Sequence, residues 1–174
     1  YTRGYAPVQV AMITVAPMDR QGNFSFGLTN CCQPELLSVA EHIILEVNPA
    51  MPVVYGLEED HIHISEVDCI VESREPLNTS PSRAPGDLDR QIAAQIFPYL
   101  HDGMTLQLGI GGMPNALGEL IAASDLKDLG MHTELMSDGY LALYKAGKIT
   151  NRKKKLLRGK GIFSICLGST ELYQ

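Results

Sequence analysis

The chain has 174 residues, of which 45% are hydrophobic and 20% are charged, a composition typical of soluble globular proteins. Its formal net charge of −6 at pH 7 argues against a general nucleic-acid binder or a binder of anionic membranes. No apolar run approaches the roughly 18 residues of a membrane-spanning helix, and no secretory signal is visible in the sequence.

The cysteines indicate where in the cell the protein lies, and the chain ends indicate whether the sequence is part of a longer protein. The four cysteines form no C-x-x-C pair and no framework spacing, which argues against a zinc site or a disulfide scaffold. We therefore expect reduced thiols and a cytoplasmic location. The first residue is Tyr1 rather than Met, and Gln174 lies just inside an apparent helix start. These features lead us to expect an internal fragment of a longer protein.

The first part of the chain alternates short strands with a helical segment. Residues 8–15 form a β-rich run that ends at a proline, and residues 42–47 predict a buried strand. Between them, residues 23–30 predict a short strand or a ligand-facing loop, with core packing favoured for its two phenylalanines. Residues 34–41 predict a short helix. This alternation predicts an α/β sheet.

Two histidines at alternate positions, His61 and His63, invite a metal-site interpretation. Alternate residues of a strand point to the same side, so two imidazoles can share an ion, with Glu66, Asp68 or a distant group as third ligand. Alternatively, both are ordinary polar residues on a strand near the domain junction. We favour the second interpretation and expect no metal.

A linker is predicted near the middle of the chain. Residues 77–85 are rich in Pro and Ser, and we place a domain boundary near residue 83. Beyond it, apolar residues recur at four-residue intervals over residues 87–100, which predicts a helix. Pro98 should bend or end its last turn.

A glycine-rich turn then separates a predicted strand at residues 104–108 from a predicted helix that begins near Pro114. Backbone N–H groups at such a junction have no intrahelical partner, so the loop can hold a phosphate or a developing oxyanion. One alternative is a simple strand-to-helix connection. Another is a dinucleotide-binding loop, which fits poorly because Pro114 occupies the third glycine position of G-x-G-x-x-G.

Residues 130–139 predict a second strand that ends at a turn, and this strand contains Glu134. Alternation places Met131, Thr133 and Leu135 on one face and His132, Glu134 and Met136 on the other. An acid within a buried parallel strand is costly unless it is paired or lies near a cleft. Taken alone, Glu134 is either a catalytic group or a surface or paired residue.

The last part of the chain continues the α/β pattern. Residues 140–146 predict a helix closed by Gly147, and residues 162–167 predict a buried strand. The small-residue turn at residues 168–170 is placed to line the same cleft. The basic run at residues 152–155 is typical of a solvated face.

Several of these segments together resemble a known family. The segments LQLGIGGMPNALGELI, DLGMHTELMSDGYLALYKAGKITN and GKGIFSICLGSTELY resemble the acetate/butyrate and 4-hydroxybutyrate CoA-transferases of the acetyl-CoA hydrolase/transferase family. VAMITVAPMDRQGNFSFGLTN and HIHISEVDCIVE resemble the same family, so the resemblance covers nearly the whole chain. It implies an α/β, CoA-transferase-like fold of the NagB/RpiA type, an open sheet with flanking helices. Residues 1–83 would end an N-terminal domain, and residues 84–174 would begin the C-terminal domain that carries the catalytic glutamate.

The resemblance also implies a site. Glu134 falls on the family's nucleophilic glutamate, with N–H donors from Gly111 and Gly112 stabilising the oxyanion. The CoA-contacting residues would be Gly109, Ile110, Gly111, Gly112 and Met113. Gln107 is a candidate for holding the substrate carboxylate. Lys154 or Lys160 meeting a CoA phosphate is the alternative to a solvated basic face.

The implied activity is CoA transfer between a short-chain acyl-CoA and a carboxylate, of the butyryl-CoA/acetate or 4-hydroxybutyrate type, by ping-pong kinetics through a glutamyl-CoA thioester. Coenzyme A is then a substrate and no cofactor is permanently bound. A homo-oligomer is expected on the resemblance, with no nucleic-acid or membrane partner. Two alternatives stay open: an acyl-CoA hydrolase that uses the same glutamate, and a non-catalytic CoA- or nucleotide-binding module.

Overall fold

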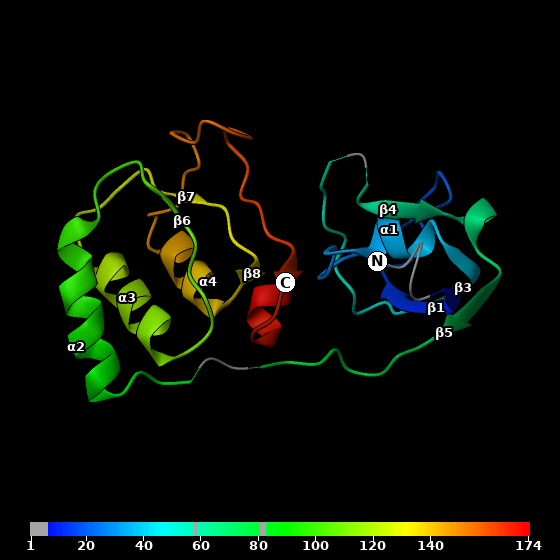
Figure 1. Ribbon diagram of the computed structural model, residues 1–174, viewed down its shortest axis with the longest axis horizontal. Helices are drawn as coiled ribbons and strands as arrows, with labels where there is room; N and C mark the ends of the chain where they lie inside the picture. The colour runs from blue at the N-terminus through cyan, green and yellow to red at the C-terminus, as the bar shows by residue number, and fades with distance from the viewer. Residues whose placement is uncertain (1–6, 58, 81–82) are drawn as a thin grey trace. The chain divides into compact units, whose positions relative to one another are not determined.

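The structure is a computed structural model that describes residues 7–57, 59–80 and 83–174 (Figure 1). Contacts between residues divide the chain into two compact units, one ending at Asn78 and one running from Thr79 to Leu172. Each combines helices with small sheets, which confirms the predicted mixed α/β class. The assignment of the two parts to an N-terminal and a C-terminal domain stays a prediction.

The first unit is built on a three-stranded parallel sheet in the order β1-β3-β5. Its strands are β1 (Val8–Val15), β3 (Ala40–Val47) and β5 (Cys69–Glu72), so the predicted strands at residues 8–15 and 42–47 are confirmed. Val8 pairs with Ala40 and Ile44 with Cys69. β-branched residues dominate β1 because they pack well on a pleated surface.

Shorter elements complete this unit. α1 (Gln33–Leu37) contacts β1 and β3, and β2 (Asn23–Ser25) pairs antiparallel with β4 (His61–His63), which leads into the 3₁₀ turn η1 (Ile64–Glu66). The predicted helix is shorter than expected because the chain already enters β3 at Ala40. The predicted core role of the phenylalanines is confirmed. The buried cluster consists of Ala11, Val15, Phe24, Phe26, Leu37, Ile43, Leu45 and Ile62.

Three helices frame the second unit: α2 (Asp87–Ile96), α3 (Gly112–Ala123) and α4 (Asp138–Lys145), with α3 in contact with both others (Figure 1). The helix predicted at residues 87–100 ends at Ile96 and continues as the 3₁₀ turn η2 (Phe97–Tyr99). This confirms the break expected at Pro98, since proline donates no backbone hydrogen bond.

The strands of the second unit are shorter than predicted. β6 (Thr105–Leu106) pairs in parallel with β7 (Gly130–Met131), and β8 (Leu135–Met136) pairs in parallel with β9 (Ile165–Cys166). The strand expected within residues 130–139 is therefore split into β7 and β8. The turn at residues 168–170 leads into the 3₁₀ turn η3 (Thr170–Tyr173) rather than an α-helix.

Candidate active site

Glu134 occupies the break between β7 and β8. Its backbone carbonyl accepts hydrogen bonds from two successive N–H groups, those of Ser164 (3.0 Å) and Ile165 (2.9 Å). Two residues thus oppose one, which is the geometry of a bulge, and bulges bend a strand and re-aim its side chains. The alternation predicted for this segment is confirmed up to Glu134: Met131 and Thr133 are buried, whereas His132 and Glu134 are exposed. Beyond it, Leu135 and Met136 are both half-buried, so the predicted difference between their faces is not seen.

The glycine loop begins beside Glu134. Leu106 pairs with Met131, and the N–H of His132 donates to the carbonyl of Leu106. Farther along, Thr133 Oγ1 lies 3.5 Å from the carbonyl oxygen of Leu108. The residues that immediately precede Gly109 and Glu134 are therefore neighbours within one unit of the protein.

Gly111 sets the conformation of the loop. Its φ of 125° and ψ of 177° lie in a region that is essentially accessible to glycine alone, and it is the N-cap residue of α3. No side chain caps this helix in the described part of the chain. The N–H groups of its first turn can therefore face a ligand anion. The helix begins at Gly112, two residues earlier than expected.

Asp89 is a neighbour of this loop that the sequence did not reveal. Its carboxylate accepts a hydrogen bond from the N–H of Gly86 at 2.9 Å, and a Cβ added to Gly112 would lie only 2.0 Å from Asp89 Oδ2. A side chain at position 112 would therefore have to displace the Asp89 carboxylate. The negative charge of Asp89 opposes binding of an anion at the same helix end.

The remaining predicted residues lie in the same segment of the unit. Ile110 is 72% exposed, and Met113 is half-buried in the first turn of α3. Gln107 is exposed between the buried Leu106 and Leu108, and the register sets it opposite His132, which is also exposed. His132 was not a sequence candidate as a functional group. Its position two residues before Glu134, on the same side of the strand, was the available signal.

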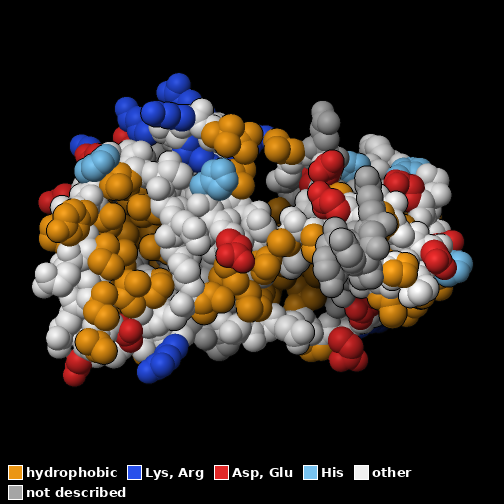
Figure 2. Space-filling model, in the orientation of Figure 1, with side chains coloured by type: hydrophobic (Ala, Val, Ile, Leu, Met, Phe, Trp, Pro, Cys, Tyr) orange, Lys and Arg blue, Asp and Glu red, His pale blue; other side chains and the backbone are white. Residues whose placement is uncertain are grey.

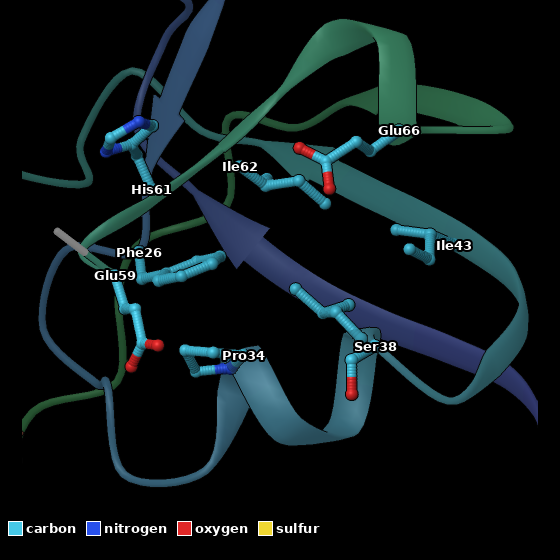
Figure 3. A pocket seen from close by; sticks show the side chains of 9 residues that line it. Phe26, Pro34, Ser38, Ile43, Glu59, His61, Ile62 and Glu66 are labelled. Atoms are coloured by element: carbon cyan, nitrogen blue, oxygen red, sulfur yellow. The ribbon is translucent and has the colours of Figure 1, made fainter.

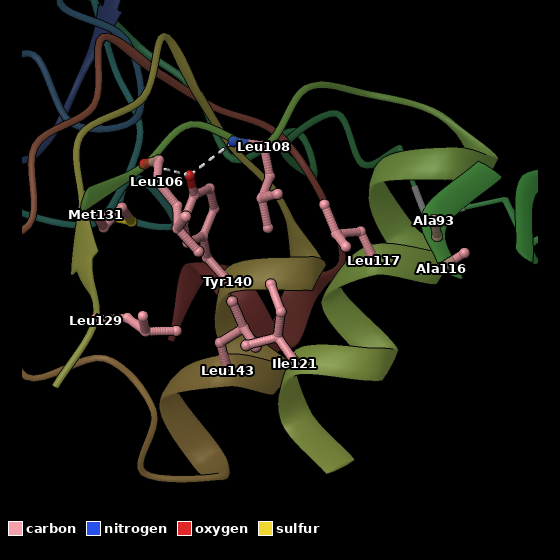
Figure 4. Packing of buried hydrophobic residues seen from close by; sticks show 10 residues of the cluster. All are labelled: Ala93, Leu106, Leu108, Ala116, Leu117, Ile121, Leu129, Met131, Tyr140 and Leu143. Atoms are coloured by element: carbon pink, nitrogen blue, oxygen red, sulfur yellow. Dashed lines mark hydrogen bonds between the residues drawn. The ribbon is translucent and has the colours of Figure 1, made fainter. Parts of the chain in front are cut away.

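Tyr140 of α4 fixes the backbone of the strand that leads into the glycine loop (Figure 4). Its hydroxyl accepts a hydrogen bond from the N–H of Leu108 (2.9 Å) and donates one to the carbonyl of Leu106 (3.0 Å). The side chain is 1% exposed, and burial raises the pKa of its hydroxyl above its usual range. Residues around it form the core of the unit: Ala93, Leu106, Leu108, Ala116, Leu117, Ile121, Leu129, Met131 and Leu143.

We expect Tyr140→Phe to weaken both the fold and the site. The ring stays in place, but the N–H of Leu108 and the carbonyl of Leu106 lose their shared buried partner, at a cost of roughly 1–3 kcal/mol. Urea unfolding measures the loss. Tyr144→Phe, at an exposed position of the same helix, is the matched control and should change the free energy of unfolding by less than about 0.5 kcal/mol. Equal stabilities of the two variants would contradict this role.

The basic run at residues 152–155 contains both exposed and buried side chains. Arg152, Lys153 and Lys155 are exposed, as the solvated-face interpretation predicts. Lys154 is only 5% exposed, and its Nζ donates to the carbonyls of Met131 (2.9 Å) and Lys160 (2.6 Å). Burial lowers the pKa of this amine. The alternative that Lys154 meets a CoA phosphate is therefore wrong, because its ammonium group already binds the backbone.

The histidines of the first unit have protein partners. His61 Nδ1 lies 2.6 Å from Asp60 Oδ1, and His63 Nδ1 lies 2.7 Å from Ser65 Oγ. Among the described residues, no group of three or more His, Cys, Asp or Glu side chains is arranged to hold a metal ion. A pocket of about 200 Å³ lies in this unit (Figure 3). It is lined by Phe26, Pro34, Leu37, Ser38, Ile43, Glu59, His61, Ile62 and Glu66.

Comparison with known proteins finds relatives along nearly the whole chain. Residues 1–79 match the model of the acetyl-CoA hydrolase/transferase N-terminal domain. Over 170 residues, 96% of this chain, it is 46% identical to a probable butyrate:acetyl-CoA coenzyme A-transferase of Syntrophomonas wolfei. It is 44% identical, over 99% of its length, to the butyryl-CoA:acetate CoA-transferase of Anaerostipes caccae. The predicted resemblance to the acetyl-CoA hydrolase/transferase family is confirmed. More distant relatives include an acetyl-CoA hydrolase of Schizosaccharomyces pombe, 26% identical.

Solved structures agree with this assignment. The 4-hydroxybutyrate CoA-transferase of Porphyromonas gingivalis superimposes with a TM-score of 0.91 at 36% identity, over 98% of this chain and 43% of that one. The chain spans 38% and 40% of the lengths of the first two curated relatives. Over the part of the chain described here, the helices are all too short or too polar to cross a bilayer.

Proposed function

We propose that the protein is an acyl-CoA:carboxylate CoA-transferase for short-chain acids and that Glu134 is its nucleophile. The observation that carries the proposal is the exposed Glu134 at a strand bulge, beside a glycine loop whose backbone N–H groups lie at an uncapped helix start. The names of the relatives at 44–46% identity support the same reaction.

The chemistry follows from these groups. The carboxylate of Glu134 attacks the thioester carbonyl of an acyl-CoA, which forms a mixed anhydride and releases CoA thiolate. The thiolate then attacks the glutamyl carbonyl and expels the product carboxylate, leaving a glutamyl-CoA thioester. An acceptor carboxylate reverses both steps to form the new acyl-CoA. Because the first carboxylate leaves before the second reacts, the kinetics are ping-pong.

The glycine loop supplies stabilisation in this scheme. Each attack creates a tetrahedral oxyanion, and the N–H groups of Gly111 and Gly112 are the donors we assign to it. One such donor contributes about 3 kcal/mol in other acyl-transfer sites. The exposed Gln107 can hydrogen-bond the carboxylate of the substrate acid, and residues 109–113 would contact CoA. Binding of the distant nucleotide helps to position the reacting thioester.

The finer fold and domain assignments belong to the same proposal. Residues 1–83 would be the end of an N-terminal CoA-transferase domain, and residues 84–174 the beginning of a C-terminal domain of the NagB/RpiA type. A cytoplasmic homo-oligomer with coenzyme A as substrate accompanies this assignment.

Covalent labelling tests the mechanism. Incubation with butyryl-CoA in the absence of an acceptor should raise the intact mass by that of CoA less one water, and peptide mapping should place the adduct on Glu134. Acetate should then remove the adduct and yield acetyl-CoA. A hydrolase, the second candidate because of the distant relatives, would consume butyryl-CoA at the same rate with or without acetate. Butyryl-CoA turnover with no adduct at Glu134 would overturn the proposed nucleophile.

A further inference from the structure

A loop of concentrated positive charge lies outside the predicted active-site residues. Residues 152–160, here called the basic loop, follow α4 and precede the segment whose N–H groups bond to the carbonyl of Glu134. Figure 2 shows Lys and Arg side chains gathered at this loop. Five of its side chains are exposed cations: Arg152, Lys153, Lys155, Arg158 and Lys160.

These cations have no acidic partner among the described residues. Arg90 and Lys145 elsewhere in the unit each form an ion pair, with Glu119 and Glu171, whereas no described carboxylate lies within ion-pair distance of a basic-loop side chain. In a chain of net charge −6, a cluster of unneutralised cations is a local exception. Mutual repulsion makes such a cluster costly, so a bound anion would stabilise it.

The loop is also held in a defined shape. The carbonyl of Asn151 accepts hydrogen bonds from the N–H groups of Lys154 and Gly159, and Arg158 Nε donates to the carbonyl of Arg152 at 2.7 Å. Leu157 has a φ of 51°, a left-handed conformation that is unfavourable for a bulky side chain and that recurs at ligand-binding loops. A loop fixed before binding loses less entropy when it binds a ligand.

The buried Lys154 connects this loop to the strand that carries Glu134. Its ammonium group bridges the carbonyls of Met131 in β7 and Lys160 at the end of the loop. Glu134 lies three residues beyond Met131, which corresponds to about 10 Å along an extended strand. The base of the basic loop contacts the end of β7, whereas the proposed nucleophile lies beyond it in the break before β8.

We propose that the basic loop binds the phosphate groups at the nucleotide end of the CoA substrate. This inference rests on the proposed function, because the thioester end of the same molecule must reach Glu134. CoA carries its thiol and its phosphates at opposite ends of the pantetheine arm, and the loop offers cations away from the reacting carboxylate. Lysine and arginine side chains bind phosphate through charge-assisted hydrogen bonds.

Direct titration tests the proposal without catalysis. Adenosine 3′,5′-bisphosphate carries the 3′-phosphate and the first of the two 5′-phosphates of CoA, without the pantetheine arm or the acyl group. Its binding is measured by calorimetry at low and moderate salt. Arg152→Gln combined with Lys155→Gln removes two exposed charges and should weaken binding by about tenfold or more. Arg20→Gln combined with Arg74→Gln, two exposed positions of the first unit, is the charge-matched control and should leave the affinity unchanged.

The outcomes separate this proposal from the proposed function. Equal affinity of both double variants and the unsubstituted protein, or no binding of the bisphosphate, would overturn the basic-loop assignment even if CoA transfer is observed. Loss of affinity confined to the basic-loop variant would support it even if no transfer occurs. A transfer assay that compares CoA with 3′-dephospho-CoA adds a second readout, because the basic-loop variant should discriminate less between them.

Discussion

Replacing Glu134 by Gln should abolish CoA transfer while leaving the fold intact. The amide has the shape of the carboxylate but no nucleophilic oxygen, so neither the mixed anhydride nor the glutamyl thioester can form. Loss of a covalent nucleophile elsewhere costs about six orders of magnitude in kcat, and a comparably large loss is expected here. Because the Glu134 side chain is exposed, the free energy of unfolding should change by less than about 0.5 kcal/mol.

The matched control is Glu119→Gln on α3. This residue is also exposed, and its ion pair with Arg90 is a surface pair that contributes little to stability. It should retain turnover and stability close to those of the unsubstituted protein. Acyl-CoA consumption measured with and without acetate, together with urea unfolding of both variants, completes the comparison. Near-normal transfer by Glu134→Gln would remove Glu134 from the mechanism.

Local patterns in the sequence predicted much of the fold. The β-rich run of β1, the four-residue apolar spacing of α2 and the proline at its end are local signals, and each is confirmed. The break at Glu134 was not predicted, because a bulge depends on how two distant segments pair. Its defining bonds come from Ser164 and Ile165, which lie 30 and 31 positions along the chain.

The site was only partly predictable for the same reason. The glycine loop and Glu134 carry recognisable residue types, and the parallel pairing of β6 with β7 brings together the strands that precede them. Tyr140 and Lys154 gave no local signal of their roles. Tyr140 reaches 32 and 34 positions back to the strand before the loop, and Lys154 reaches 23 positions back to β7. Long-range hydrogen bonds of single side chains leave no periodicity in the sequence.

Gly111→Ala should disable the site through the backbone. The φ of 125° at Gly111 is one that an L-residue with a Cβ rarely adopts, so the variant must either accept roughly 1–3 kcal/mol of strain or move the loop. Moving the loop displaces the N–H groups assigned to the oxyanion, and loss of one such donor lowers kcat by about 10²–10³-fold elsewhere. Urea unfolding and kcat for butyryl-CoA with acetate measure the two effects.

Gly109→Ala provides the contrast within the same loop. Gly109 lies outside the left-handed region, and a Cβ added there meets no described atom within 4 Å. Its stability should therefore stay within about 0.5 kcal/mol of the unsubstituted protein. If CoA approaches this backbone closely, as proposed, the added methyl group should raise KM for acyl-CoA while Gly111→Ala mainly lowers kcat. Identical kinetics and stability for the two variants would show that neither conformation nor close approach distinguishes these glycines, and the loop would lose its assigned role.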